Sequence, residues 1–290
     1  QILYGSRRTY LKKVAVADFE GICANTTFVL ESKDNSIFDN RLLPFIMLSD
    51  AFTRWSIAHS KGSTNPYVLF SDLADYEFDL LPIAEQKILA DKLWTAHRLK
   101  ESYKKLLAAT EKMVKSQFIE MFKGDNQVPL GDICNIEKGA TITRNDVLPG
   151  EVPVVAGGQE PSCYHNVANR EAGAITVSAS GAYAGYINFW NCPIFASDCN
   201  TIISKDDEKT DQTFVYFGLR AMQKQIYGLQ KGGAQPHVYG KDLQKFMFPC
   251  PSYAKQIEFS KMAKQADKSG FELRKSIEAI DQVIKSLINN

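Results

Sequence analysis

The chain has 290 residues, of which 34 are Lys or Arg and 33 are Asp or Glu, so its formal charge at neutral pH is +1. A hydrophobic content of 44% with 23% charged residues argues against intrinsic disorder and is ordinary for a globular protein. The near-zero charge argues against a strongly basic protein that binds nucleic acid regardless of sequence. A role on DNA would need local basic patches or a basic partner.

Neither the apolar runs nor the cysteines indicate a membrane or a metal. The longest apolar run, near Leu42 to Leu48, contains a proline and is far shorter than the roughly 18–20 residues of a membrane span. No basic-then-apolar signal sequence is recognised, so we expect a cytoplasmic protein. The six cysteines are expected to be reduced thiols, and the pair Cys163 and His165 offers only two of the about four ligands of a zinc site.

The first two segments expected along the chain are a mixed domain over residues 1–82 and a long helix over 83–123. A second mixed domain is expected over residues 128–251, and a second long helix over 252–290. The second helix lacks proline after Pro251, and about 37 residues of continuous helix would measure about 55 Å.

Within the second mixed domain, short β-branched runs alternate with residues typical of turns. The runs at residues 152–156, 174–178 and 201–204 predict strands, and residues 213–227 predict a helix.

The second long helix carries apolar or small residues in two interleaved series with a period of seven. These are Phe259, Ala266, Leu273, Ile280 and Leu287, with Ala263, Gly270, Ile277 and Ile284 between them. Such a seam predicts packing along the length of another helix. The first long helix has a weaker seam, interrupted by Lys100, formed by Leu89, Leu93, Ala96, Tyr103, Leu107, Thr110, Val114 and Gln117. The favoured partner of each long helix is the other one; the alternative is a single amphipathic helix lying on a domain.

A shift of 170 positions aligns two stretches of the chain. It places Gly62–Val68 on Gly232–Val238, and Asp72-Leu73 on Asp242-Leu243. It also places Gln86 on Gln256. Agreement in the same order over such a length predicts a tandem duplication.

The alignment is less regular upstream. A shift of 175 places Ala24-Asn25-Thr26 on Cys199-Asn200-Thr201, and Gly5 is aligned with Gly181. By this symmetry about 50 residues of the first copy are expected to be missing on its N-terminal side.

The duplicated pattern resembles the specificity subunit of type I restriction–modification enzymes. The pattern is Gly-x-x-Gln/Asn-Pro-x-Val, then Asp-Leu, a proline and a glutamine that opens a long helix. Residues 128–133, followed by Lys138-Gly139, are similar to the opening of a target-recognition domain in that family. The resemblance implies an α+β fold, with two target-recognition domains separated by two long antiparallel helices that form a coiled-coil spacer.

The resemblance also implies a function. It indicates a non-catalytic chain that reads a bipartite target in double-stranded DNA and docks methyltransferase subunits, and restriction subunits in the full complex. S-adenosylmethionine, ATP and Mg are then expected on the partner subunits, with no cofactor on this chain. Recognition would combine phosphate contacts with side chains that read base edges.

Candidate DNA contacts are polar or basic residues in loops and turns. In the first half they are Arg7, Arg8, Tyr10, Lys12, Lys13, Lys61 and Asn65. In the second half they are Lys138, Thr141, Thr143, Arg144, Gln159, Ser178, Ser180, Tyr183, Lys231, Gln235, His237 and Lys241. A solvated surface is the alternative role for each of these residues.

Three rival functions stay open on the sequence alone. One is a self-contained nuclease or methyltransferase, although Asn65-Pro66-Tyr67 lacks the second proline of an adenine methyltransferase loop. Another is an adaptor whose helices only join proteins. The third is a truncated or silent specificity subunit that reads one half-site and forms a homodimer.

Overall fold

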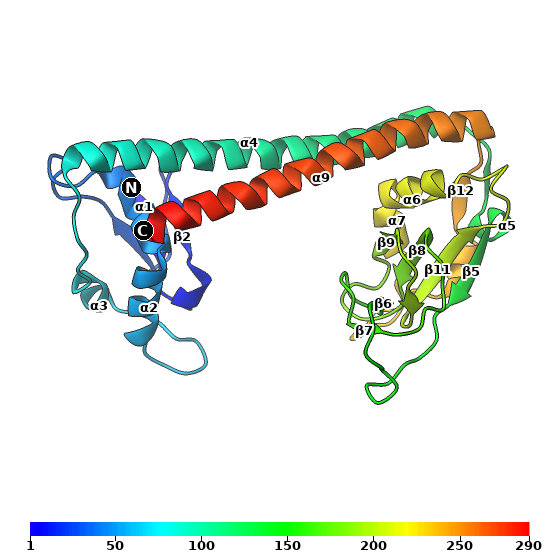
Figure 1. Cartoon of the computed structure of the whole chain (residues 1–290), viewed down its shortest axis with the longest axis horizontal. Helices are drawn as coiled ribbons and strands as arrows, with labels where there is room; N and C mark the ends of the chain where they lie inside the picture. Colours follow the sequence, from blue (N-terminus) through cyan, green and yellow to red (C-terminus); the bar gives the residue numbers. More distant parts are fainter. Residues whose placement is uncertain (290) are drawn as a thin grey trace. The chain divides into compact units, whose positions relative to one another are not determined.

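The computed structural model describes residues 1–289, which divide into two compact units (Figure 1). Unit 1 contains residues 1–107 and the C-terminal stretch from Glu272, and unit 2 contains residues 108–271. Two long helices, α4 (Ile83–Phe122) and α9 (Tyr253–Asn289), each contribute one end to either unit. The expected α+β class with two long helices is confirmed. No helix within residues 1–289 is both long and apolar enough to cross a membrane.

Unit 1 is built on a three-stranded antiparallel sheet in the order β2-β1-β3. Its elements besides the long helices are β1 (Ile2–Gly5), η1 (Thr9–Leu11), β2 (Val14–Val16), β3 (Thr27–Leu30), η2 (Asn40–Leu42), α1 (Leu43–Leu48), α2 (Asp50–Ala58) and α3 (Phe70–Ala74). The sheet buries Ile2 and Tyr4 against Phe52 of α2, because alternate residues of a strand point to the same face.

Unit 2 is larger and contains three small sheets. Its strands are β4 (Gln127–Pro129), β5 (Cys134–Lys138), β6 (Val152–Val155), β7 (Cys163–His165), β8 (Ala174–Ser178), β9 (Ile187–Trp190), β10 (Phe195–Ala196), β11 (Cys199–Ser204) and β12 (Met247–Pro249). Its short helices are α5 (Leu130–Ile133), α6 (Gln212–Ala221), α7 (Gln223–Tyr227) and α8 (Gly240–Gln244). The three expected strands are therefore present as β6, β8 and β11, whereas residues 213–227, expected as one helix, form α6 and α7, which are divided at Met222.

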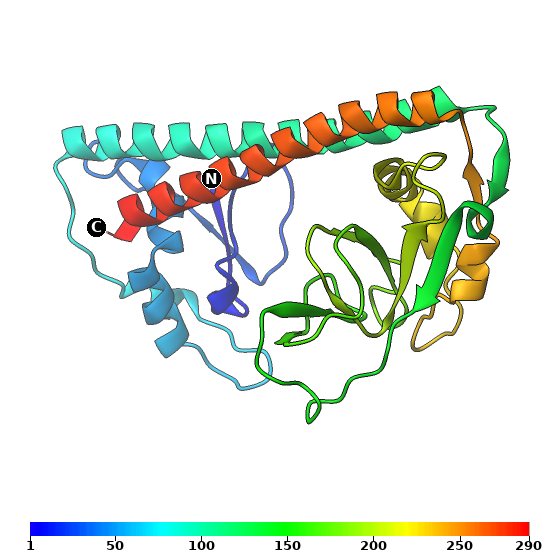
Figure 2. The same cartoon turned by 45° about the vertical axis from the view of Figure 1, so that its right-hand side comes forward.

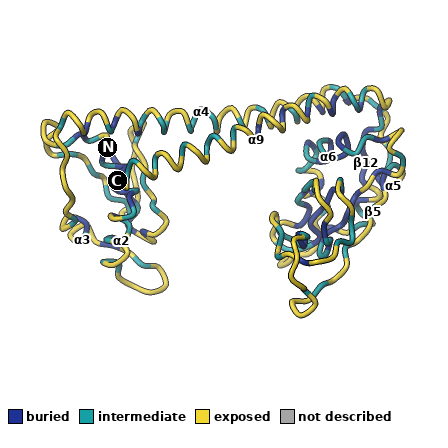
Figure 3. The backbone as a smooth tube through the Cα atoms, in the orientation of Figure 1, coloured by how far each residue is buried: buried dark blue, intermediate teal, exposed yellow. Residues whose placement is uncertain are grey.

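The core of unit 2 lies on both sides of α6. Figures 1 and 2 show α6 between the sheet β5-β11-β8-β9 and the long helices, and Figure 3 shows the central strands as buried. Phe214 of α6 is fully buried, and its ring centroid lies 5.0 Å from that of Phe122 in α4 and 6.2 Å from that of Phe259 in α9. The helix therefore contributes apolar side chains to its contacts with the sheet and with the long helices.

The long helices pack against each other within each unit. In unit 1, the last turns of α9 pack on the first turns of α4 through Leu89, Ile284 and Leu287. In unit 2, the start of α9 packs on the end of α4, with the rings of Phe118 and Phe259 5.4 Å apart. The two helices therefore run antiparallel. All nine seam positions of α9 are buried or half-buried, and the corresponding positions of α4 are too, except Gln117. Lys100 is half-buried in the seam and forms an ion pair with Asp281 of α9.

The three-stranded sheet of unit 1 matches three of the four strands of the sheet β5-β11-β8-β9 in unit 2. Ile2 in β1 lies opposite Val16 and Leu30, as Ile175 in β8 lies opposite Phe189 and Ile202. The sheet β2-β1-β3 thus corresponds to β9-β8-β11, with offsets of 172 and 173 residues.

These offsets correct part of the sequence alignment. The counterpart of Gly181 is Arg8 and not Gly5, and the counterpart of Cys199 is Thr27 and not Ala24. The error is three residues in both places, because the loops between the sheet and the long helices differ in length. Short polar motifs whose strand partners are unknown do not determine, from the sequence alone, the register in which the two copies align.

A buried glutamine joins each mixed segment to its long helix. Gln86 Nε2 donates to Ile37 O and Leu81 O, and Asp39 N donates to Gln86 Oε1. In unit 2, Gln256 Nε2 donates to Lys209 O and Pro251 O, and Asp211 N donates to Gln256 Oε1. Each glutamine is 1% exposed. Both units thus have the same three hydrogen bonds, which supports the duplication.

Candidate DNA-recognition surface

Each unit contains a turn whose first and last residues are joined by two reciprocal backbone hydrogen bonds. Lys61 N donates to Tyr67 O at 2.7 Å and Tyr67 N to Lys61 O at 2.9 Å. The pairing of Lys231 with His237 has distances of 2.9 and 2.8 Å. Gly62 and Gly232 follow the lysines with φ of +85° and +97°, values at which a side chain would be strained. We call residues 61–67 and 231–237 the shared turns.

The lysines that open the shared turns are held by carboxylates. Lys61 Nζ lies 3.4 Å from Asp72 Oδ2, and Lys231 Nζ lies 2.7 Å from Asp242 Oδ2. The ammonium groups therefore fix the base of each turn to the short helix that follows. Asn65 and Gln235, in contrast, are exposed in the turns.

The segment after the first strand lies beside the shared turn. Arg8 N donates to Pro66 O at 2.6 Å in unit 1, and Gly181 N donates to Pro236 O at 3.1 Å in unit 2. The backbone of Arg7 forms an isolated antiparallel β-bridge with that of Tyr67. The basic stretch of unit 1 and its shared turn are thus brought together, although the hydrogen-bonded residues Arg8 and Pro66 are 58 positions apart in the sequence.

Two residues of this basic stretch have a strained backbone. Arg8 and Lys12 have φ of 52° and 47°, and they are the non-glycine residues with left-handed φ within residues 1–289. Their counterparts in unit 2 are Gly181 and Gly185, with φ of 81° and 89°. Side chains at left-handed positions cost free energy and commonly mark functional sites.

The basic side chains of unit 1 differ in their availability. Lys12 Nζ donates to Leu48 O at 3.0 Å and to Asp50 Oδ1 at 2.7 Å, and this bond lowers the pKa of Asp50. Lys12 therefore holds η1 to α2. Arg7, Arg8 and Tyr10 are exposed, and no hydrogen bond of the Arg8 guanidinium is found within residues 1–289. Lys13 is exposed, with its ammonium 3.3 Å from Arg7 O.

In unit 2, the end of β5 and the loop after it contain several of the residues predicted to contact DNA. Lys138, Thr141 and Arg144 are exposed. Thr143 donates from its backbone N and its hydroxyl to Asp146 Oδ2, at 3.0 and 2.6 Å, which lowers the pKa of Asp146. Thr143 thus shapes the loop, while its neighbours are free to reach a ligand.

Other predicted residues of unit 2 are spread between surface and core. Gln159 and Tyr183 are exposed. Ser178 is buried in β8, and its hydroxyl donates to Gly158 O at 3.3 Å, so its side chain does not reach the surface. Ser180 is half-buried, and its hydroxyl donates to Asp198.

An aromatic residue that the sequence argument missed lies after the second shared turn. The rings of His237 and Tyr239 stack with centroids 5.9 Å apart, and Lys241 Nζ lies 5.7 Å from the Tyr239 ring centroid. Tyr239 is 45% exposed. Its counterpart at an offset of 170 is Leu69, so the repeat gave no signal for an aromatic residue here.

The side chains of the described residues give no indication of catalysis. No group of three His, Cys, Asp or Glu among residues 1–289 is arranged to hold a metal ion. Burial raises the pKa of Cys134 and of Cys199 to about 12, which makes both unsuited to be nucleophiles at neutral pH.

Comparison with known protein families identifies the family of the chain. The family described as type I restriction modification DNA specificity domain matches residues 124–282, which is more than half of the chain. The chain belongs to this family. Membership confirms the resemblance seen in the duplicated pattern, and the specificity-subunit family is non-catalytic.

The individual relatives share low sequence identity with this chain. The chain is 26% identical over 129 residues to the type I restriction enzyme EcoDI specificity subunit of Escherichia coli, a match that covers 43% of this chain and 28% of that protein. The fold is similar to that of a type I restriction–modification S subunit from M. genitalium, with a TM-score of 0.71, 18% identity and coverage of 99% of this chain and 81% of that one. A chain described in work on assembly and conformational transition of a type I system has a TM-score of 0.58, 18% identity and coverage of 99% and 80%.

Proposed function

We propose that this chain recognises a bipartite DNA target within a type I restriction–modification complex, with each unit reading one part. The duplicated shared turn carries the proposal, because both units place the same turn beside the segment that follows the first strand of the shared sheet. A target in two parts requires two reading modules, and half-sites about one helical turn apart require about 34 Å between them. We assign the spacing to the antiparallel helices.

The two units divide the contacts between phosphates and bases. Elements that both units share cannot distinguish two different half-sites, so we assign the shared turns, with Asn65 and Gln235, to the DNA backbone. The segments that differ read the bases. In unit 1 these include Arg8, because an arginine can form a bidentate pair with guanine; in unit 2 they include Arg144 and Gln159.

The outer face of α4 supports docking of methyltransferase subunits. Leu99, Leu106 and Met113 recur every seven residues and are 43%, 52% and 50% exposed. Apolar side chains in a row on one helix face are typical of a protein interface. The docked subunits would supply S-adenosylmethionine and flip the target adenine, and restriction subunits would supply ATP-dependent cleavage. The boundaries 1–82, 83–123, 128–251 and 252–290 remain our proposed domain division.

The test is co-expression with a type I methyltransferase subunit, followed by mapping of methylated adenines. We expect a split motif. Arg144→Ala should relax one part of the motif, whereas Lys92→Ala, an exposed lysine on α4, should change neither part. Met113→Glu should abolish co-purification with the methyltransferase subunit, and Lys112→Glu should not.

Other outcomes identify the rival functions. A palindromic motif would indicate a homodimer of half-site readers. Co-purification without any sequence-dependent methylation would indicate an adaptor. Modification or cleavage of DNA by the purified chain alone would indicate an enzyme and refute the proposal.

A further inference from the structure

Unit 2 places an aspartate beside its shared turn. Asp198, which precedes β11, is half-buried, and the hydroxyl of Ser180 donates to its Oδ2. Ala179 N donates to Asp198 O at 3.0 Å, and the backbone of Ser180 forms an isolated antiparallel β-bridge with that of His237 in the shared turn. The carboxylate therefore lies next to the segments that are proposed to contact DNA.

The loop after β6 packs directly against this aspartate. A Cβ atom on Gly157 would lie 2.7 Å from Ser180 O and 3.2 Å from Asp198 Oδ2, so the close approach requires glycine. Asn188 Nδ2 donates to Gln159 O at 2.8 Å, which fixes the end of the loop. Gln159 and Asp198 are thus carried by two segments that are in contact with each other.

Within residues 1–289, the Asp198 carboxylate forms no ion pair, and no hydrogen bond to its Oδ1 is found. A carboxylate on a surface that approaches DNA is repelled by phosphates, because both are negatively charged. It can instead accept a hydrogen bond from the edge of a base. In the major groove the N4 amino group of cytosine is a donor that Asp recognises, whereas adenine places its N7 acceptor beside its amino group. A carboxylate at this place therefore favours cytosine.

The matching position in unit 1 has the opposite polarity. Ser6 N donates to Thr26 O at 2.9 Å, which is the counterpart of the backbone bond to Asp198 O in unit 2. At the offsets of the shared sheet, Thr26 takes the place of Asp198, and Arg7 takes the place of Ser180. The same backbone thus carries a positive charge in unit 1 and a negative charge in unit 2. Guanine presents acceptors in the major groove and cytosine a donor, so the two units suit different bases.

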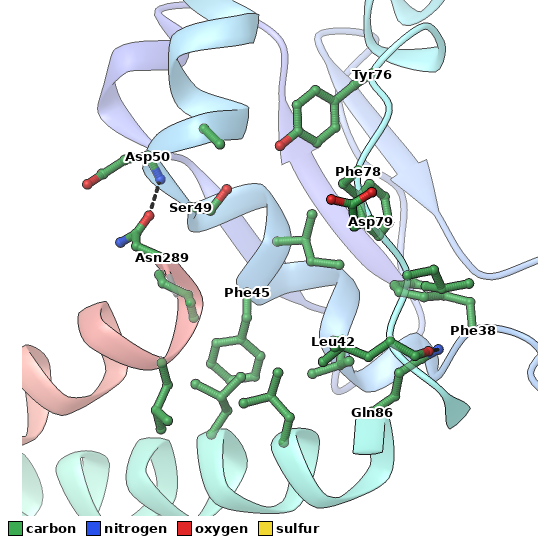
Figure 4. Close-up of a pocket in the computed structure, with 18 of the residues that line it drawn as sticks. Phe38, Leu42, Phe45, Ser49, Asp50, Tyr76, Phe78, Asp79, Gln86 and Asn289 are labelled. Atoms are coloured by element: carbon green, nitrogen blue, oxygen red, sulfur yellow. Dashed lines mark hydrogen bonds between the residues drawn. The ribbon is translucent and has the colours of Figure 1, made fainter. Parts of the chain in front are cut away.

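Lys12 does not contribute to this difference in charge. Its ammonium donates to Asp50 Oδ1 at 2.7 Å, and Asp50 N donates to Asn289 Oδ1 at 2.8 Å, beside an apolar cavity of about 490 Å³ (Figure 4). Lys12 is therefore held by the scaffold of unit 1. The exposed residues Arg7 and Arg8 supply the positive charge near the first shared turn.

We propose that Asp198 reads a cytosine in the half-site of unit 2, with its Oδ1 accepting a hydrogen bond from the N4 amino group. Ser180 is a positioning residue, because its hydroxyl holds Oδ2 and leaves Oδ1 for the base. This assignment rests on the proposed function, since it names a base within the target that the chain is proposed to read.

The test is co-expression of variants with a type I methyltransferase subunit, followed by mapping of methylated adenines. In the half of the motif that Arg144→Ala relaxes, Asp198→Ala should reduce the preference for one G·C pair by about fivefold or more. Ser180→Ala should relax the same pair to a smaller extent. Asp207→Ala is the matched control and should change nothing, because it removes the same charge from an exposed loop at the other end of β11.

DNA binding by the assembled complex tests the base contact itself. The cytosine of that pair is replaced by pyrimidin-2-one, which lacks the amino group. This replacement should weaken binding of the unaltered chain by about fivefold or more. It should not weaken binding of the Asp198→Ala variant, because the partner of the amino group is already absent.

The assignment is wrong if the relaxed pair is A·T, or if both variants leave the motif unchanged. It is also wrong if the replaced base weakens binding of the Asp198→Ala complex as much as that of the unaltered one. If Asp198→Ala prevents methylation, Ser180→Ala decides, because it keeps the charge: a relaxed G·C pair supports the assignment and an unchanged motif overturns it. Absence of a split motif with the unaltered chain refutes the proposed function instead.

Discussion

The left-handed backbone at Arg8 permits a substitution that should separate stability from function. A side chain in this conformation costs about 1–2 kcal/mol, which Arg8→Gly would remove. The glycine also makes the unfolded chain more flexible, which costs about 0.4–1 kcal/mol. We therefore expect Arg8→Gly to raise the free energy of unfolding by about 0.5–1 kcal/mol. Its counterpart Gly181 shows that glycine is compatible with the position.

The same substitution should weaken DNA binding. The chain loses one exposed charge, so the slope of log K against log salt should decrease by about 0.9 if Arg8 contacts a phosphate. If Arg8 reads a base, the loss should be about 1–3 kcal/mol and should be confined to one base pair of the target. Arg7→Gly is the matched control, because it removes the same charge from a residue whose φ is not left-handed. It should lower stability.

Urea unfolding followed by circular dichroism measures the first effect, and DNA binding at several salt concentrations measures the second. The reasoning fails if Arg8→Gly destabilises the chain as much as Arg7→Gly does. It also fails if Arg8→Gly leaves DNA affinity unchanged, because the strained position would then have no binding role.

The remaining predictions concern the core of unit 2 and its thiols. Phe118→Ala should lower the free energy of unfolding by about 3–5 kcal/mol in urea unfolding, since it leaves a cavity among four rings. Gln256→Leu should lower it by about 3 kcal/mol or more, because one buried carbonyl, one part-buried carbonyl and one part-buried N–H lose their partner. At pH 8 a thiol reagent should modify exposed Cys192 quickly in the folded chain but leave Cys134 and Cys199 unmodified. Because the folded pKa of both thiols is about 12 against an ordinary 9.0, their burial should stabilise the chain fully below pH 9 and progressively less as the pH rises toward 12.

Sequence patterns were sufficient to predict the two long helices and three of the strands of unit 2. The series of seven from Phe259 to Leu287 predicted one face of α9, and the structure buries or half-buries every member. Lys100, which interrupts the seam of α4, is accommodated by its pairing with Asp281, a contact that spacing alone could not reveal. Strands with β-branched runs were equally clear, because their pattern depends on local residues alone.

Less of the candidate site than of the fold could be predicted from the sequence. Residue type identified Lys12 and Lys231 as possible DNA contacts, but each ammonium is held by an aspartate distant in the sequence or across a turn. Ser178 has a polar side chain, yet its position in a central strand buries it. Whether a polar residue faces solvent depends on tertiary pairing, for which the sequence carries only weak signals. The left-handed φ of Arg8 has no sequence signature either, since arginine rarely adopts it.

The matched hydrogen bonds of Gln86 and Gln256 have a consequence for how such proteins can change. Because both glutamines make the same three hydrogen bonds, a crossover between gene copies within the codons around them would exchange whole mixed segments and leave these hydrogen bonds intact. A new target specificity could then arise by recombination in one step, without compensating substitutions in the scaffold.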